Sequence, residues 1–445
     1  MPNKKPGFST LAVHAGAAPD ATTGARTTPI YQTASFVFAD ADHAAALFGL
    51  REFGNVYTRI TNPTQAVLEE RVAALEGGTA ALAVASGQAA QMLVFHILMS
   101  PGDNFIAAHQ LYGGSINQFG HAFGNFGWNV RWADAADPGS FEEQIDGRTR
   151  AIFVESLTNP AGLFTDIEAI AAIAHRHGLP FIVDNTLATP YLLRPLEHGA
   201  DIVVHSLTKF LGGHGNSVGG IIVDGGTFDW SRSGNYPMLS EPRPEYDGIV
   251  LHQAFGNTAL AVAVRALGLR DLGPSISPFN AFQILTGIET LPLRMQRHSD
   301  NALAVATWLR KQKQVAWVNY SGLHDHPNHA LQRRYSPKGA GAVFTFGLQV
   351  TNGMAAAVVA GTTDETSAAV AAGRLFVEGL QLISHLANIG DTRSLVTHPA
   401  STTHRQLTLD QQIAAGAGPE VVRLSIGIED PDDLIEDIRQ ALEKI

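Results

Sequence analysis

Cysteine is absent from the 445-residue sequence. This absence excludes disulfide bonds, thiolate nucleophiles and metal sites built on cysteine, and it is compatible with a reducing cytoplasm. Basic residues are also few: the sequence has 30 Lys and Arg and 41 Asp and Glu, which gives a net charge of −11. That balance argues against a nucleic acid or an anionic membrane as the main partner.

Long apolar runs are missing as well. The basic N-terminal segment has no apolar stretch of signal-peptide length, and no later run of about 18 apolar residues is free of polar interruptions. We therefore expect a soluble, cytoplasmic protein without membrane contact. The chain also lacks internal repeats and low-complexity tracts, and its 45 % hydrophobic content is typical of a globular protein with substantial cores.

The hydrophobic pattern from Pro63 onward alternates between strand and helix periods. Strands are expected at 80–85, 104–107, 130–132, 151–155, 181–184, 202–205 and 220–223, with helices at 64–75, 88–99, 114–123 and 167–177. This alternation predicts an α/β protein with a mostly parallel central sheet that helices cover on both faces. A helix at 257–269, the segment 279–291 and a long helix at 294–313 lead into a smaller C-terminal α/β domain. Its expected strands are 342–349 and 422–426, and its expected helices are 366–375 and 431–444.

The first 60 or so residues show little periodicity and are interpreted as an extended arm with a helix at 40–48. Because such an arm cannot bury itself, we expect it to contact a neighbouring subunit. Residues 227–246 carry several prolines and aromatics and predict a long, ordered surface loop. The chain is accordingly divided into an arm at 1–62, a large domain at 63–292 and a small domain at 293–445.

A lysine stands directly after a buried strand in the stretch 201–220. Lys209 follows two hydroxyl side chains, Ser206 and Thr208, and precedes five glycines that allow a ligand to approach the backbone closely. Ligands of open α/β sheets bind outside the carboxyl ends of the strands. The position thus indicates a binding site, although an ordinary solvated surface lysine is the alternative.

Two further segments resemble parts of a cofactor site. Asp184 closes the strand FIVD, where a carboxylate is costly without a cationic partner, and Gly87 and Gln88 open a helix whose N-terminus favours an anion. Taken singly, these residues fit a turn-capping Asp and a tight turn equally well. Together with Lys209 they meet the needs of pyridoxal phosphate (PLP), which requires a lysine, a carboxylate for its ring nitrogen and donors for its phosphate.

Seven motifs in order along the chain resemble the Cys/Met-metabolism family of PLP enzymes. They are 57–63, 86–88, 111–113, 184–186, 206–215, 398–404 (HPASTTH) and 422–430 (VRLSIGIED). The resemblance implies the aspartate aminotransferase-like fold, fold type I. Within the family, 384–394, 398–404 and the insertion near Trp230 are most similar to O-acetylhomoserine sulfhydrylases.

The resemblance assigns roles to individual residues. Lys209 would form the Schiff base with PLP, Asp184 would pair with the ring nitrogen, and Tyr112 would stack on the ring; these three are the expected catalytic residues. Asn159 would contact the ring hydroxyl. The phosphate would be held by Gly87, Gln88, Ser206 and Thr208, joined by Tyr57 and Arg59 from a neighbouring subunit.

The resemblance also implies the substrate site and the reaction. Arg423 would bind the substrate carboxylate, and Asn388 and Tyr57 would face the substrate. The expected reaction is a γ-replacement in which sulfide or a small thiol such as methanethiol displaces acetate from O-acetyl-L-homoserine, giving homocysteine or methionine. The family implies a homo-oligomer, most simply a tetramer built as a dimer of dimers.

Several alternatives stay open from the sequence. Methionine γ-lyase, cystathionine γ-synthase and an O-succinylhomoserine sulfhydrylase share the motifs, although Gly113 and Gly114 stand where γ-lyases often carry a cysteine. A phosphate-ligand binding protein is another class. A nucleotide-dependent dehydrogenase is disfavoured because no strand leads into G-x-G-x-x-G. The histidines at 324, 326 and 329 have no acidic company beyond Asp325, so no metal site is expected.

Overall fold

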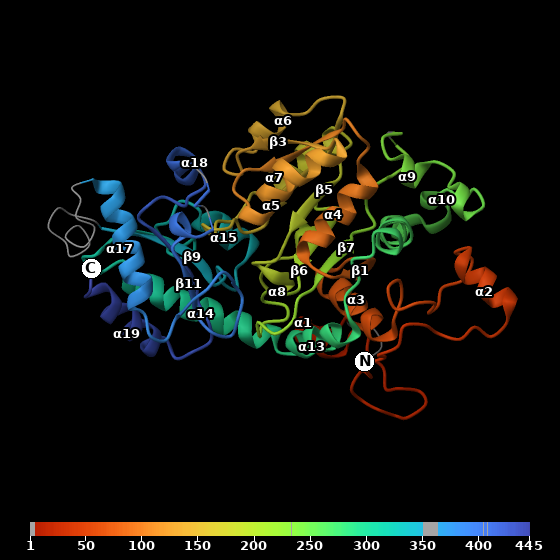
Figure 1. Ribbon diagram of the computed structural model, residues 1–445, viewed down its shortest axis with the longest axis horizontal. Coiled ribbons are helices and arrows are strands. Elements are labelled where there is room, and N and C mark those ends of the chain that lie inside the picture. The colour runs from red at the N-terminus through yellow and green to blue at the C-terminus, as the bar shows by residue number, and fades with distance from the viewer. Residues whose placement is uncertain (1–4, 233, 350–363, 404, 407) are drawn as a thin grey trace.

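The computed structural model describes residues 5–232, 234–349, 364–403, 405–406 and 408–445 (Figure 1). Its larger sheet has seven strands in the order β1-β7-β6-β5-β4-β2-β3. The strands are β1 (Ala80–Val84), β2 (Asn104–Ala108), β3 (Asn129–Ala133), β4 (Thr149–Glu155), β5 (Phe181–Asp184), β6 (Ile202–Ser206) and β7 (Gly220–Asp224). Only β7 pairs antiparallel with its neighbours, so the predicted mostly parallel central sheet is confirmed.

A smaller sheet of five strands lies in the C-terminal part of the chain, in the order β10-β11-β12-β9-β8. Its strands are β8 (Val315–Asn319), β9 (Val343–Leu348), β10 (Ser384–His385), β11 (Leu395–Thr397) and β12 (Val421–Ser425). The sequence predicted β9 and β12 but missed the other three. The mixed α/β class is confirmed, while the domain boundaries at 62 and 292 stay predictions.

Helices surround both sheets, and Figure 1 shows α17 and α19 beside the smaller sheet and α4 and α7 beside the larger one. In the first half of the chain they are α1 (Phe8–His14), α2 (Ala41–Phe48), α3 (Pro63–Glu76), α4 (Gly87–Leu98), α5 (Gly113–Asn117), α6 (Gly139–Glu143), α7 (Ile167–Arg176) and α8 (Thr189–Leu192). The others are α9 (Pro237–Ser240), α10 (Leu251–Phe255), α11 (Ala259–Ala263), α12 (Arg270–Leu272), α13 (Pro278–Glu289), α14 (Leu291–Leu309), α15 (His329–Tyr335), α17 (Glu365–Gly379), α18 (Leu409–Ala414) and α19 (Pro431–Leu442).

The helices that position the site begin at recognisable caps. The Ser86 side chain accepts a hydrogen bond from the Ala89 amide at the start of α4, and Asn62 caps α3 just before Pro63. Strands β4, β5 and β6 run parallel and are apolar and buried almost to their last residue. Their polar final residues therefore meet at one edge of the sheet, where Glu155 and Asp184 are register partners.

Three predicted elements differ from the structure. The helix expected at 114–123 is a short α5 followed by a π turn (Gln118–Ala122) and a 3-10 turn, because its glycines weaken the helix and Phe119 and Phe123 pack into an aromatic cluster. The helix expected at 257–269 is likewise divided between α11 and a π segment, Val264–Leu269.

The surface loop predicted at 227–246 is anchored to the core and contains a short helix, which the sequence did not predict. Its ring side chains Trp230 and Tyr236 are buried and pack against each other with ring centroids 5.3 Å apart. Most of the described residues of the segment are exposed or half-buried, so it lies at the surface as predicted, while these rings anchor it to the hydrophobic core and it contains the short helix α9. Ser233 within it and His404 of the HPASTTH motif lie outside the described residues.

The N-terminal arm carries α2 away from the body of the molecule (Figure 1). The helix predicted at 40–48 is α2, and the structure shows that the Asp40 side chain caps its start. Large apolar side chains of the arm are exposed, among them Val37 (97 %) and Phe53 (71 %).

In the described part of the chain, no helix combines the length and the apolar character that crossing a membrane requires.

Candidate functional site

A cavity of about 260 Å³ opens at the carboxyl edge of the larger sheet. Segments from both sheets contribute to its walls. The predicted site residues that line it are Gly87, Gln88, Tyr112, Asn159, Asp184, Ser206, Thr208, Lys209, Asn388 and Arg423. The fold therefore brings together residues more than 300 positions apart in the sequence.

Lys209 lies at the centre of this group. Its Nζ donates a hydrogen bond to Asn388 Oδ1 at 2.5 Å, which orients the amine from the opposite wall of the cavity. Burial and the nearby Arg423 guanidinium lower the pKa of Lys209 to about 8. An amine with this pKa is partly neutral near pH 7, which suits a nucleophile or a proton carrier.

We expect the reactivity of Lys209 in the cofactor-free protein to follow this lowered pKa. The amine reacts only when neutral, so its labelling should rise as pH increases through about 8 and should level off above it. At pH 7 its neutral fraction is roughly 300-fold larger than that of an ordinary lysine. Competitive acetylation read by mass spectrometry checks this, and a midpoint near the ordinary value of 10.5 would contradict it.

Asp184 lies on the floor of the cavity at the end of β5. Its Oδ1 accepts hydrogen bonds from the Thr186 amide at 3.0 Å and hydroxyl at 2.5 Å, and its Oδ2 accepts one from Gln91 at 3.3 Å. Burial raises the pKa of Asp184 despite the bonds from Thr186. A protonated ring nitrogen against this carboxylate would offset that burial, as the sequence predicted.

One end of the cavity is shaped for an anion. Gly87 and Gln88 form the first turn of α4, a 12-residue helix whose N-terminal amides point toward an incoming negative group. A Cβ on Gly87 would lie 3.0 Å from the Cβ of Ser206, so any larger residue would crowd the end of β6. The Thr208 hydroxyl pairs with the Gly219 carbonyl and amide, which fixes the glycine-rich turn beside it.

The opposite end is cationic. Arg423 is 6 % exposed, and it donates from Nη1 to Asn159 Oδ1 and from Nη2 to the Asn388 carbonyl, both at 3.2 Å. Its buried Nε finds no hydrogen-bond partner among the described residues, and burial lowers its pKa to about 10. A buried guanidinium with an unused donor indicates a binding site for a carboxylate.

Tyr112 lines the cavity and is 49 % exposed. An aromatic ring held open beside a lysine and a buried carboxylate offers a face on which a planar ligand can stack. The donor set thus fits PLP at every part of the cofactor: an amine, a carboxylate for the ring nitrogen, an aromatic face and a helix N-terminus for the phosphate.

The structure adds residues that sequence reasoning missed. Gln91 reaches Asp184 from one helical turn beyond Gly87, an i, i+4 spacing that could have identified it. Arg294 of α14 donates to the Phe210 carbonyl at 2.8 Å and to the Gly287 carbonyl at 2.7 Å, and so holds the turn that follows Lys209. No local pattern could have identified its role, because the Phe210 carbonyl beside Lys209 is 84 positions away in the sequence.

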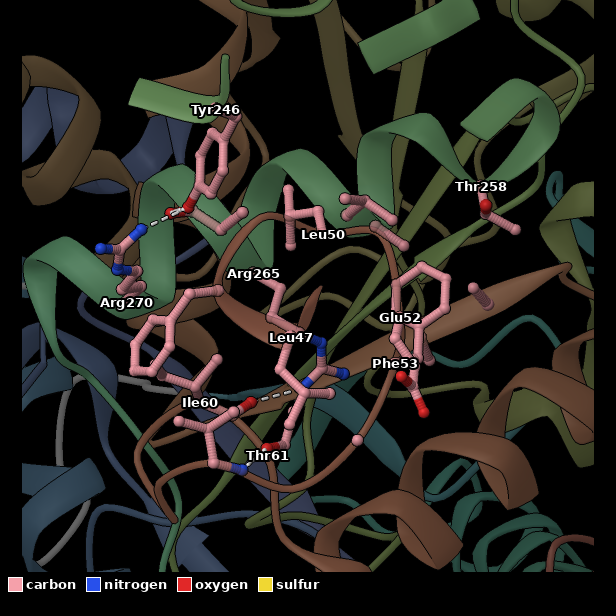
Figure 2. Close-up of a pocket in the computed structure, with 18 residues that line it drawn as sticks. Leu47, Leu50, Glu52, Phe53, Ile60, Thr61, Tyr246, Thr258, Arg265 and Arg270 are labelled. Atoms are coloured by element: carbon pink, nitrogen blue, oxygen red, sulfur yellow. Dashed lines mark hydrogen bonds between the residues drawn. The ribbon is translucent and has the colours of Figure 1, made fainter. Parts of the chain in front are cut away.

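Tyr57 and Arg59 do not line this cavity. The Arg59 guanidinium lies 5.5 Å from the centroid of the Tyr57 ring and donates to the Arg270 carbonyl. Their sequence neighbours Val56 and Ile60 line a second, largely apolar cavity of about 320 Å³, which includes Leu47 and Phe53 of the arm. Figure 2 shows this cavity, in which Arg265 donates to the Ile60 carbonyl.

The three histidines noted in the sequence, His324, His326 and His329, do not share one set of contacts. His324 Nδ1 lies 3.3 Å from His329 Nε2, whereas His326 is bound to Asn319. In the ranges that the structure covers, His, Asp and Glu form no group of three or more with metal-site geometry.

Comparison with known proteins identifies close relatives. Residues 9–443 match the family model described as "Cys/Met metabolism PLP-dependent enzyme". The chain is 49 % identical to O-acetyl-L-homoserine sulfhydrylase of Leptospira meyeri, over all of this chain and 98 % of that one. It is 50 % identical to O-acetyl-L-homoserine sulfhydrylase 1 of Thermus thermophilus, over 98 % of this chain and 99 % of the other.

A solved structure shares the whole fold. A Campylobacter jejuni crystal structure that contains N'-pyridoxyl-lysine-5'-monophosphate superposes with a TM-score of 0.91 at 38 % identity. The match covers 98 % of this chain and 99 % of that one.

Proposed function

The chain belongs to the Cys/Met metabolism family of PLP-dependent enzymes, and from this premise we propose that it converts O-acetyl-L-homoserine and sulfide to L-homocysteine and acetate. Methanethiol in place of sulfide would give L-methionine. The observation that carries the proposal is the cavity in which Lys209, Asp184 and Arg423 meet. Full-length relatives at 49 and 50 % identity bear the sulfhydrylase name.

The residues of the cavity divide between holding the cofactor and binding the substrate. Lys209 would carry PLP covalently, Asp184 would keep the ring nitrogen protonated, and Tyr112 and Asn159 would hold the ring. The Gly87 and Gln88 amides and the Ser206 and Thr208 hydroxyls would bind the phosphate. When bound, PLP supplies an electron sink that makes the carbon-bound protons of an amino acid acidic.

The remaining chemistry is proton transfer and orientation by the protein. Lys209 Nζ would remove the α-proton and return protons along the substrate chain, and its pKa of about 8 keeps both proton states accessible near neutral pH. Asn388 holds that amine in place. Arg423 would bind the substrate carboxylate with two parallel N–H donors, which orients the γ-carbon and its acetate for displacement.

The charge of the cavity favours an acetyl over a succinyl donor. Within the described part of the chain, Lys209 and Arg423 are the cationic side chains that line it, and both already have roles. The extra carboxylate of a succinyl group would therefore be desolvated without a cation. Comparing turnover of the O-acetyl and O-succinyl esters tests this, and equal turnover would contradict it.

The reaction itself is tested by product analysis. O-Acetyl-L-homoserine is supplied to the purified protein with and without sulfide, and homocysteine and α-ketobutyrate are measured. Homocysteine that appears only with sulfide supports the proposal. Ketoacid and ammonia formed without sulfide would reassign the enzyme as a γ-lyase of the same family.

The arm supports a homo-oligomer in which Tyr57 and Arg59 reach a partner's phosphate site. Both lie outside their own cavity, Tyr57 is 43 % exposed, and the arm projects from the body (Figure 1). The exposed Val37 and Phe53 would be covered in a dimer. Two such dimers would form the tetramer.

Mixing two inactive variants tests the shared site. Lys209→Ala subunits supply Arg59, and Arg59→Ala subunits supply Lys209, so random reassociation after mild unfolding should restore about a quarter of wild-type activity. If Arg59 acts within its own subunit, the mixture should show no more activity than the two variants assayed apart. Either variant alone is the control for the refolding step.

A further inference from the structure

One buried carboxylate ties together the two residues that flank the cofactor ring in the proposed function. Glu155 ends β4 and is 4 % exposed. Its Oε1 accepts the Tyr112 amide at 2.7 Å, and its Oε2 accepts the Asn159 amide at 3.0 Å. Tyr112 and Asn159 are 47 positions apart, and this side chain connects their backbones directly.

The chemistry of this contact needs a carboxylate. Two acceptor oxygens face two N–H donors, whereas a glutamine of the same length has one oxygen and would place its NH₂ against the second donor. Burial and the adjacent Asp184 carboxylate raise the pKa of Glu155 well above its ordinary value, and the Tyr112 and Asn159 amides oppose that rise because they bind the charged form. A carboxyl group kept in such an unfavourable place is typical of a functional site.

The contact continues toward the substrate. Asn159 Oδ1 accepts a hydrogen bond from Arg423, so the Glu155 carboxylate, the Asn159 side chain and the Arg423 guanidinium form one connected line. A shift of the 159 backbone would thus move both a ring contact and the proposed carboxylate site.

We propose that Glu155 is a positioning residue that sets the distance between Tyr112 and Asn159, and thereby the orientation of the cofactor ring against Asp184 and Lys209. The inference rests on the proposed cofactor site but does not depend on which substrate is used. It assigns to Glu155 no contact with the reacting atoms.

The test compares Glu155→Gln with Asp103→Asn. Asp103 is a buried carboxylate, 3 % exposed, that directly precedes β2 and binds the Ser100 amide and Arg150, which lies near the start of β4, the strand that Glu155 ends. Each apoprotein is titrated with PLP, and the circular dichroism of the bound cofactor is recorded in the visible region. Thermal unfolding of both apoproteins measures the purely structural loss.

For Glu155→Gln we expect the PLP dissociation constant to rise about tenfold or more, since one buried amide loses its acceptor. The visible dichroism should weaken or change sign per bound PLP, and KM for the amino acid should rise together with a fall in kcat. Asp103→Asn should lose thermal stability but keep the wild-type PLP affinity and dichroism. Unchanged affinity and dichroism in Glu155→Gln would overturn the proposal.

A second variant keeps the proposal testable if Glu155→Gln does not fold. Glu155→Asp keeps the charge but is one methylene shorter, so it cannot reach both amides; it should also weaken the dichroism, and wild-type dichroism would overturn the proposal. The PLP affinity and the visible dichroism are measured without substrate and do not depend on the reaction. A failure to form homocysteine would therefore count against the proposed reaction and leave the Glu155 result to be judged separately.

Discussion

Lys209→Ala should purify without the yellow colour of bound PLP and should lose turnover by at least about 10³-fold. The loss is large because one amine would serve both as the covalent anchor and as the proton carrier. Among the described residues, Lys209 is the lysine whose side chain lines the cavity, and its hydrogen bond to Asn388 orients the amine. Absorbance after dialysis and a homocysteine assay measure the two effects.

Lys338→Ala is the matched control for this substitution. Lys338 also has a lowered pKa, caused by burial, and its Nζ lies 4.4 Å from the centroid of the Tyr191 ring. It does not line the cavity, so its variant should keep colour and turnover. Retained colour in dialysed Lys209→Ala would remove the basis of the site assignment.

Asp184→Asn should keep covalent PLP through Lys209 but should lose most of its turnover. The amide can still accept the Thr186 hydrogen bonds, yet it carries no charge to hold a ring-nitrogen proton. Removing one partner of a buried ion pair costs about 3–5 kcal/mol. If that whole cost is lost from transition-state stabilisation, kcat should fall by roughly 10²- to 10⁴-fold.

The control for Asp184→Asn is Asp201→Asn. Asp201 is also buried, but it lies at the other edge of the sheet, where it accepts the Phe181 amide at 2.9 Å and contacts His175. This variant should lose stability in thermal unfolding without a comparable fall in kcat. Turnover within about tenfold of wild type in Asp184→Asn would contradict the proposed role of the carboxylate.

The hydrophobic pattern of the sequence was sufficient to predict those helices and strands whose boundaries are marked by neighbouring residues. Strand β5 (Phe181–Asp184) matches its prediction residue for residue, because its apolar run ends at a polar residue. Helix α2 (Ala41–Phe48) matches the helix predicted at 40–48 to within one residue. The short strands β10 and β11 were missed, since two or three residues carry too little periodicity to distinguish them from a loop.

The sequence by itself determined the α/β class, the family and the residues placed at strand ends and helix starts, because each depends on short segments with their own spacing. Only the tertiary structure decided which of these residues meet. The strand order β1-β7-β6-β5-β4-β2-β3 and the contact of Lys209 with Asn388, 179 positions later, follow from how distant segments pack. The pKa of Lys209 and the double contact of Glu155 depend on burial and neighbours, which exist only in the folded chain.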